Sequence, residues 1–270
     1  LILFEDALRH LIRIARILAM PCGCALLVGV GGSGKQSLTR LSAYMARSTL
    51  FQVTLTKTYN VASFMEDLKF CQDIAGHQRK SVTFMLTDAE IKNEAFLEYV
   101  NSLLLTGEVP GLFAKDELMG ITADLAPVFA KARPDMEENQ DNLRQYFFDL
   151  ARDNLHIVLC FSPVNAKFSE RARRFPGLFS GCTIDWFLPW PEQALVSVSK
   201  GFLGEYQMET PDDVKASLMT HMGMVHNMVV QVCEEYYGSM RRHVYQTPKS
   251  YLAFIANYKA LYQVKLQALQ

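Results

Sequence analysis

The sequence lacks a long apolar segment and a basic cluster, and each absence narrows the class of protein. No uninterrupted apolar run approaches the roughly 18 residues that a membrane-spanning helix needs, so we expect a chain that does not enter a membrane. The 27 basic and 28 acidic residues are interspersed and give a formal net charge of -1. No basic stripe carries interleaved aromatic side chains, so we expect no nucleic acid as a partner.

The sequence also lacks paired cysteines. Its six cysteines show no C-x-x-C spacing, and several lie within apolar runs. This pattern predicts reduced, buried thiols rather than a disulfide framework. Cys22 and Cys24 form at most half of a metal site, since no second Cys or His pair follows at suitable spacing. The chain begins with Leu1 and both ends fall inside helical patterns, so we expect it to be part of a longer protein.

What is present is typical of a folded domain. A chain of 270 residues with 50% hydrophobic and 20% charged residues can form one large domain, or a large and a small one. Five apolar runs predict strands, and the segments between them show helical spacing. This alternation predicts an α/β fold with a five-stranded parallel sheet sandwiched by helices. The expected strands lie at 24–28, 50–56, 81–87, 155–161 and 182–187.

Beyond Pro191 the strand patterns stop, and helices are expected at 191–205, 211–237 and 248–270. We therefore expect a large α/β nucleotide-binding domain over 1–189 and a small all-α lid domain over 190–250. The last helix, 251–270, repeats apolar residues at steps of three and four. It is either packed against the lid or is the root of a longer coiled-coil helix.

A glycine-rich loop directly follows the first predicted strand. Four glycines and a lysine have the spacing G-x-x-x-x-G-K, which is the P-loop pattern. Glycine allows the tight turn, backbone N–H groups surround the phosphates, and the lysine reaches the terminal ones. The sequence therefore predicts a nucleotide-phosphate site. Its residues are Gly29, Gly31, Gly32, Ser33, Gly34, Lys35, Gln36 and Ser37.

One position departs from the P-loop pattern. The residue after the lysine is normally Ser or Thr, whose hydroxyl holds Mg²⁺, but here it is Gln36, and Ser37 follows one place later.

A nucleotide-hydrolysing site also needs acidic residues and a polar sensor at neighbouring strand ends. The third strand ends at Thr87, followed by Asp88, Ala89 and Glu90. If Asp88 is the carboxylate on the Mg²⁺ side, the place of the catalytic glutamate holds Ala89. If Asp88 is the base, the Mg²⁺-side position holds Thr87. One carboxylate is missing in either case unless Glu90 reaches the site, and a simpler interpretation is that 87–90 cap the next helix.

Several segments resemble the fourth AAA+ module of a dynein heavy chain, and their sequences are closer to axonemal, outer-arm dyneins than to the cytoplasmic motor. The similarity covers nearly the whole chain. The segments are LFEDA at 3–7, LVGVGGSGKQSL at 27–38, FLEY at 96–99 with GEVPGLF at 107–113, CTIDWF at 182–187 and TPKSYL at 247–252.

The resemblance implies roles for individual positions. Ser37 is expected near the α-phosphate, Thr87 at the Mg²⁺-side position, and Asp88 at the catalytic position of a degenerate Walker B motif. Ser162 occupies the sensor position, where an asparagine is common. Gly181 stands where related modules carry an arginine finger. The nearby basic segment, with Arg171, Arg173 and Arg174, is either a substitute finger or a solvated helix face.

These departures favour a regulatory site. We expect the chain to bind ATP or ADP with Mg²⁺, held by Gln36 and Asp88, and to hydrolyse slowly or not at all. The alternatives are a hydrolytically competent ATPase module and a structural spacer that binds no nucleotide. By resemblance, the partners are neighbouring AAA+ modules of the same heavy chain, a coiled-coil stalk and, indirectly, microtubules. The expected location is cytoplasmic and cytoskeletal, in the axoneme of a cilium or flagellum.

Overall fold

The computed structural model describes residues 3–269, which fall into two compact units. The larger, α/β unit holds His10–Gly29 and Lys35–Trp186, and the smaller, helical unit holds residues 3–9, 30–34 and 187–269. The domain limits expected at 189 and 250 stay predictions.

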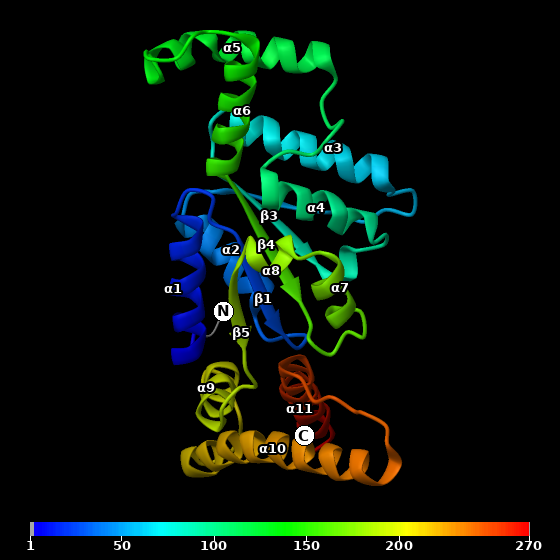
Figure 1. Ribbon diagram of the computed structural model, residues 1–270. Coiled ribbons are helices and arrows are strands. Elements are labelled where there is room, and N and C mark those ends of the chain that lie inside the picture. Colours follow the sequence, from blue (N-terminus) through cyan, green and yellow to red (C-terminus); the bar gives the residue numbers. More distant parts are fainter. Residues whose placement is uncertain (1–2, 270) are drawn as a thin grey trace. The chain divides into compact units, whose positions relative to one another are not determined.

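The α/β unit is built around a five-stranded parallel sheet with the strand order β2-β3-β4-β1-β5 (Figure 1). This confirms the predicted fold class. The second strand is shorter than the expected 50–56 and stands at the edge of the sheet, where it pairs with β3 only. The strands are β1 Ala25–Gly29, β2 Thr49–Gln52, β3 Val82–Thr87, β4 Leu155–Phe161 and β5 Thr183–Phe187.

Helices cover both faces of this sheet. Leu26 and Val28 of β1 pack in the core that also contains α3 and α4, whereas Leu27 between them points to the opposite face and is equally buried. The central strands are apolar at successive positions because both faces are covered. The first eight helices are α1 Glu5–Leu18, α2 Lys35–Met45, α3 Val61–Gln72, α4 Ala95–Thr106, α5 Lys115–Ala132, α6 Gln140–Asn154, α7 Phe168–Arg174 and α8 Gly177–Ser180.

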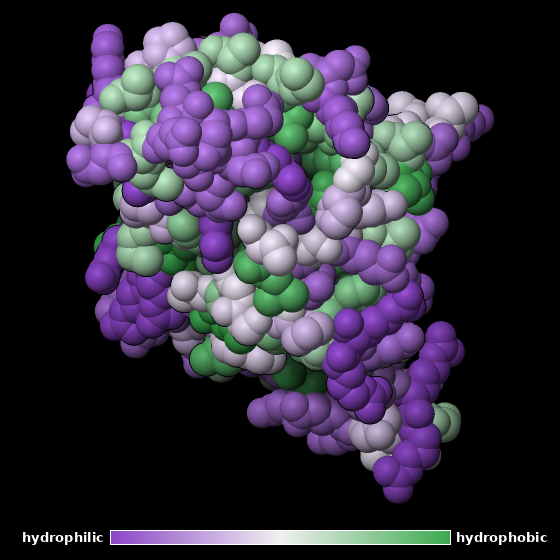
Figure 2. Space-filling view, turned by 45° about the horizontal axis from the view of Figure 1, so that its top comes forward, coloured by the Kyte–Doolittle hydropathy of each residue, from purple (hydrophilic) through white to green (hydrophobic). Residues whose placement is uncertain are grey.

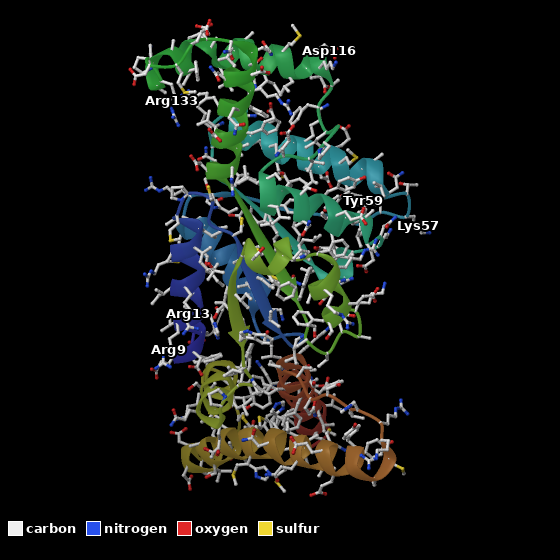
Figure 3. The ribbon with its side chains drawn as sticks, in the orientation of Figure 1. Arg9, Arg13, Lys57, Tyr59, Asp116 and Arg133 are labelled. Atoms are coloured by element: carbon white, nitrogen blue, oxygen red, sulfur yellow. The ribbon has the colours of Figure 1, made fainter. Side chains whose placement is uncertain are left out.

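Local sequence features explain several helix ends. Asn60 caps α3, and its side-chain oxygen accepts a hydrogen bond from the N–H of Ser63 at 3.0 Å. Gly107 ends α4 in the left-handed conformation with φ of 77°, which favours glycine. Asp116 in the first turn of α5 and Arg133 just beyond its last turn lie at opposite ends of that helix (Figure 3), as the helix dipole favours.

The helical unit contains α9 Glu192–Leu203, α10 Asp212–Met240 and α11 Pro248–Leu269. Its own core includes Leu195, Met222 and Ile255. Tyr251 of α11 is buried there, and its hydroxyl donates to the carbonyl oxygen of Leu195 at 2.9 Å. The first half of α11 is therefore fixed by packing, while Leu261 further along is exposed. Residue 270, the last of the expected helix, lies outside the described residues.

The surface and the thiols bear on two further expectations. Figure 2 shows hydrophobic residues scattered among hydrophilic ones on the face that it draws. None of the helices among residues 3–269 is long and apolar enough to cross a membrane.

All six cysteines are free thiols, as predicted. Cys71 and Cys160 are buried, but Cys22 is exposed, so the expectation of burial does not hold for every thiol.

Candidate functional site

The predicted site residues follow three strands of the sheet. Gly29 ends β1, Thr87 ends β3, and Ser162 comes directly after β4. β4 lies between β3 and β1, and all three strands run in the same direction. Their carboxyl ends therefore meet at one edge of the sheet, which is where ligands bind in open α/β sheets.

The glycine loop has the backbone conformation that its composition predicts. Gly32 and Gly34 have φ angles of 80° and 99°, a region that side-chain-bearing residues rarely adopt. A Cβ on Gly32 would lie 2.6 Å from the backbone nitrogen of Lys249, so position 32 also has no room for a side chain. A Cβ on Gly31 would meet no atom within 4 Å, so open space lies beside the loop.

Lys35 is a buried cation at the start of α2. Its Nζ donates to the carbonyl oxygen of Gly29 at 2.6 Å, and 8% of the residue is exposed. Burial lowers the pKa of Lys35, and the nearby Cys160 and Asp88 act in the opposite sense. A phosphate group bound at a helix N-terminus would stabilise the charge of a desolvated ammonium there.

Glu90 does not reach the site. Its Oε2 accepts the N–H of Thr87 at 2.7 Å, and its Oε1 accepts Nε2 of Gln52 at 2.6 Å. Thr87 and Glu90 form a capping box around the short 3₁₀ helix η2, Asp88–Glu90. The simpler interpretation is correct only in that 87–90 form a cap: the cap closes η2 itself and not the following helix α4, whose N-cap is Glu94. No second carboxylate is supplied by Glu90.

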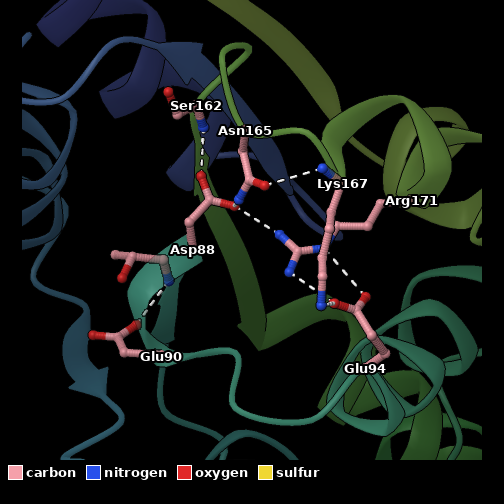
Figure 4. A network of polar contacts seen from close by, with 8 residues as sticks. Asp88, Glu90, Glu94, Ser162, Asn165, Lys167 and Arg171 are labelled. Carbon is pink, nitrogen blue, oxygen red and sulfur yellow. Dashed lines mark hydrogen bonds and ion pairs between the residues drawn. The ribbon is translucent and has the colours of Figure 1, made fainter.

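Asp88 is bonded to three donors from the segment after β4 (Figure 4). Its Oδ2 accepts the backbone N–H of Ser162 at 2.6 Å. Its Oδ1 accepts Nη1 of Arg171 at 2.7 Å and Nδ2 of Asn165 at 3.2 Å. The structure thus brings Asp88 and the sensor position together, although Ser162 takes part through its backbone.

In the basic segment of α7, the solvated helix face holds for Arg173 and Arg174 but not for Arg171, and the substitute finger stays a prediction. Arg171 is 4% exposed and paired with Asp88 and Glu94, so for this residue the solvated helix face is wrong. Arg174 does lie on an exposed face, where it pairs with Glu98 at 2.9 Å. Helical spacing did not reveal this difference, because α7 has only seven residues.

Three other predicted positions lie either at the surface or against a neighbouring helix. Gln36 and Ser37 lie exposed in the first turn of α2. Gly181 follows α8 and packs against α4, where a Cβ would lie 2.8 Å from the carbonyl oxygen of Gly177 and 3.0 Å from Cβ of Leu104. A longer side chain at 181 would require α8 and α4 to separate, so position 181 has no room for an arginine finger.

The residues present fit a nucleotide phosphate better than they fit Mg²⁺. The left-handed glycines, the open space beside Gly31 and the buried Lys35 ammonium are the features that an anionic phosphate requires. For the metal, Gln36 supplies at most an amide oxygen, and the Asp88 carboxylate is already bonded to three donors. Among residues 3–269 no cluster of three His, Cys, Asp or Glu residues suitable for a metal ion is present.

Comparison with known proteins gives a consistent result. Residues 1–261 match the family described as "P-loop containing dynein motor region D4". The chain is 50% identical to Dynein axonemal heavy chain 5 of Mus musculus over 270 residues, 100% of this chain. It is 52% identical to the Dynein gamma chain, flagellar outer arm, of Chlamydomonas reinhardtii over 265 residues, 98% of this chain. It is 49% identical to Dynein axonemal heavy chain 8 of Homo sapiens over 267 residues, 99% of this chain.

The matched region is 6% of the length of each of these three relatives. The glycine loop, the order of the strands and the match over nearly the whole chain agree with one another. The chain therefore belongs to the P-loop containing dynein motor region D4 family, the fourth AAA+ module of dynein heavy chains.

Proposed function

We propose that this chain is a nucleotide-binding regulatory module of a dynein motor that moves along microtubules toward their minus ends in cilia or flagella. The whole motor is an AAA+ ATPase, and this module holds ATP or ADP and hydrolyses it slowly or not at all. Its partners are the neighbouring AAA+ modules and, through a coiled-coil stalk that continues α11, the microtubule. The axonemal names of the relatives support this location.

The observation that carries the proposal is the contrast between an intact phosphate loop and a depleted set of acids. Lys35 and the loop glycines keep the geometry that binds phosphate. Glu90 is occupied by the backbone of Thr87, and Gln36 replaces the usual metal-binding hydroxyl. A bound Mg²⁺ would neutralise charge on the phosphates, and Asp88 would join Gln36 in holding it only by giving up one of its hydrogen bonds to Ser162, Asn165 and Arg171.

Coupling to the stalk is proposed through α11. Nucleotide occupancy would bias the orientation of this helix, and its distal half, 261–269, which is exposed except at Tyr262 and Leu266, is the part proposed to continue into the stalk. If stalk register and the position of α11 in the full-length protein were the same with and without nucleotide at this site, the coupling would be refuted.

The binding step is tested by Lys35→Ala in the full-length protein that carries this chain. We expect the nucleotide retained at this site to be lost, because the charge paired with the phosphates is removed. The measurement is the nucleotide content after rapid desalting, compared with Lys57→Ala, which changes an exposed lysine. Equal nucleotide content in the Lys35→Ala variant and the wild type would favour the structural spacer.

The hydrolysis step is tested separately. We expect single-turnover hydrolysis at this site to be slow, and Asp88→Ala to change it little. Rapid turnover that is lost in Asp88→Ala would identify a hydrolytically competent module and reject the regulatory proposal.

A further inference from the structure

A buried arginine joins two carboxylates beside the proposed site. Arg171 donates from Nη2 to Oε1 of Glu94 at 2.9 Å and from Nε to Oε2 of Glu94 at 3.2 Å. Its Nη1 donates to Oδ1 of Asp88 at 2.7 Å. The planar guanidinium thus makes a two-point contact with one carboxylate while it points a third N–H at the other (Figure 4).

Glu94 fixes the position of this arginine independently of Asp88. Lys167 adds a further contact to Oε1 of Glu94 at 3.3 Å, and the ring of Phe161 lies 5.6 Å from the guanidinium carbon. The hydrogen bond from Arg171 is the main cause that lowers the pKa of Glu94, as expected for a carboxylate paired with a guanidinium. Arg171 is therefore anchored on α7 and α4, and Asp88 meets a fixed cation.

The contacts of Asp88 engage both oxygens that a catalytic base would use, Oδ1 with two donors and Oδ2 with one. A base in this position accepts a proton from the attacking water while the new O–P bond forms and the bond from the terminal phosphorus to its bridging oxygen breaks. Asp88 already accepts hydrogen bonds from Ser162, Asn165 and Arg171. A carboxylate held by three N–H donors cannot rotate toward a water without losing at least one of them.

We propose that Arg171 is a positioning residue that restrains Asp88 and thereby withholds it from hydrolysis. Glu94 is the anchor of this restraint. The inference rests on the proposed function and deepens it, because it gives a physical reason why a site with one remaining carboxylate would keep its nucleotide. As a positioning residue, Arg171 acts through Asp88, and its proposed role requires no contact with the nucleotide.

The test removes both charges of the anchored pair, because deleting one partner alone leaves a buried charge without compensation. The variant is Arg171→Met with Glu94→Gln in the full-length protein. The matched control is Arg174→Met with Glu98→Gln, which removes an ion pair between the same two helices at side chains that are 53% and 54% exposed. Both proteins are imaged by electron cryomicroscopy without nucleotide and after a series of incubation times with ATP.

Two readouts are taken at this site, the position of the Asp88 side chain without nucleotide and the identity of the nucleotide after incubation. In the Arg171→Met/Glu94→Gln variant we expect Asp88 to leave the position bonded to Ser162 and Asn165. We expect the rate of ADP formation at this site to rise by about a hundred-fold, the lower end of the range for general base catalysis. Adding Asp88→Ala should abolish the gain, and the control should match the wild type.

An unchanged Asp88 position together with unchanged ADP formation would overturn the restraint and leave Arg171 a structural residue. If the double variant fails to fold, Arg171→Lys replaces it. Lysine keeps the charge but loses the forked geometry, so a smaller increase in the rate is expected, and no increase would again overturn the inference. Rapid ADP formation in the wild type would instead reject the proposed function, so the two failures are distinguishable.

Discussion

Asp88 and Glu90 stand two positions apart at the end of one strand and have different surroundings. Glu90 is 7% exposed and bonded to the N–H of Thr87, so it stabilises a turn. Asp88 faces the segment after β4 and is bonded to Arg171. The two side chains point apart because the 3₁₀ turn between them places residues 88 and 90 on different sides. Chemistry at this edge therefore depends on Asp88 alone among the predicted acids.

Lys35 leads to a prediction about pH at the residue scale. Its pKa is lowered by burial in the ligand-free protein, and bound phosphate raises it again because opposite charge favours the ammonium. Binding then takes up a proton above the lowered pKa, so nucleotide affinity should fall as pH rises through that value, by up to about ten-fold per pH unit. Phosphate ionisation is complete above about pH 8 and does not contribute.

The measurement is the dissociation constant of ADP at this site between pH 8 and 10.5, taken as the binding that Lys35→Ala removes. Lys35→Arg is the control, because a guanidinium with a pKa above about 12 stays charged throughout and should bind with an affinity that is independent of pH. A wild-type affinity that is constant over this interval would contradict the prediction.

At the scale of elements, most of the fold was predictable and the contacts of Asp88 were not. The predicted apolar run 155–161 matches β4, because burial on two faces requires apolar residues at successive positions of the strand. The π-helix η1, Asp73–His77, and the four-residue α8 were not predicted, since segments this short show no periodicity. Arg171 meets Asp88 across 83 positions of the chain, and no local pattern encodes such a contact.

The π-helix gives a prediction about packing. A Cβ on Gly76 would lie 2.6 Å from the fully buried ring of Phe147 on α6, so Gly76→Ala should destabilise this region by about 1–3 kcal/mol through overpacking. Gly120 on α5 is the matched control, since its Cβ would meet no atom within 4 Å. Gly120→Ala should stabilise α5 by about 0.5–1 kcal/mol, the difference in helix propensity.

Hydrogen exchange followed by mass spectrometry on the full-length protein measures both effects, in peptides from α6 for position 76 and from α5 for position 120. Faster exchange in Gly76→Ala and slower exchange in Gly120→Ala are expected. Equal effects of the two substitutions would show that the contact with Phe147 does not limit position 76.

At the scale of the whole molecule, the described residues hold separate hydrophobic cores. One core lies against one face of the sheet and includes Phe84 and Leu159, and another joins α9, α10 and α11 and includes Leu195 and Ile255. A smaller core joins α5 and α6. If each core opens as its own cooperative unit, one core can lose stability without destabilising the other. Hydrogen exchange reports the opening of each unit separately. Independent opening of the two larger cores would agree with the predicted domain limits and with the proposed change in orientation of α11.

Ile255 tests that separation. It is 1% exposed, so Ile255→Ala should destabilise the helical unit by about 2–5 kcal/mol through a cavity. Phe254, its neighbour on α11, is 38% exposed, and Phe254→Ala should have a much smaller effect. In the full-length protein we expect faster hydrogen exchange in α9, α10 and α11 for Ile255→Ala, and unchanged exchange in β1, β3 and β4. Faster exchange in those strands would mean that the two cores unfold as one unit, and α11 would then not be able to change state while the phosphate loop keeps its nucleotide.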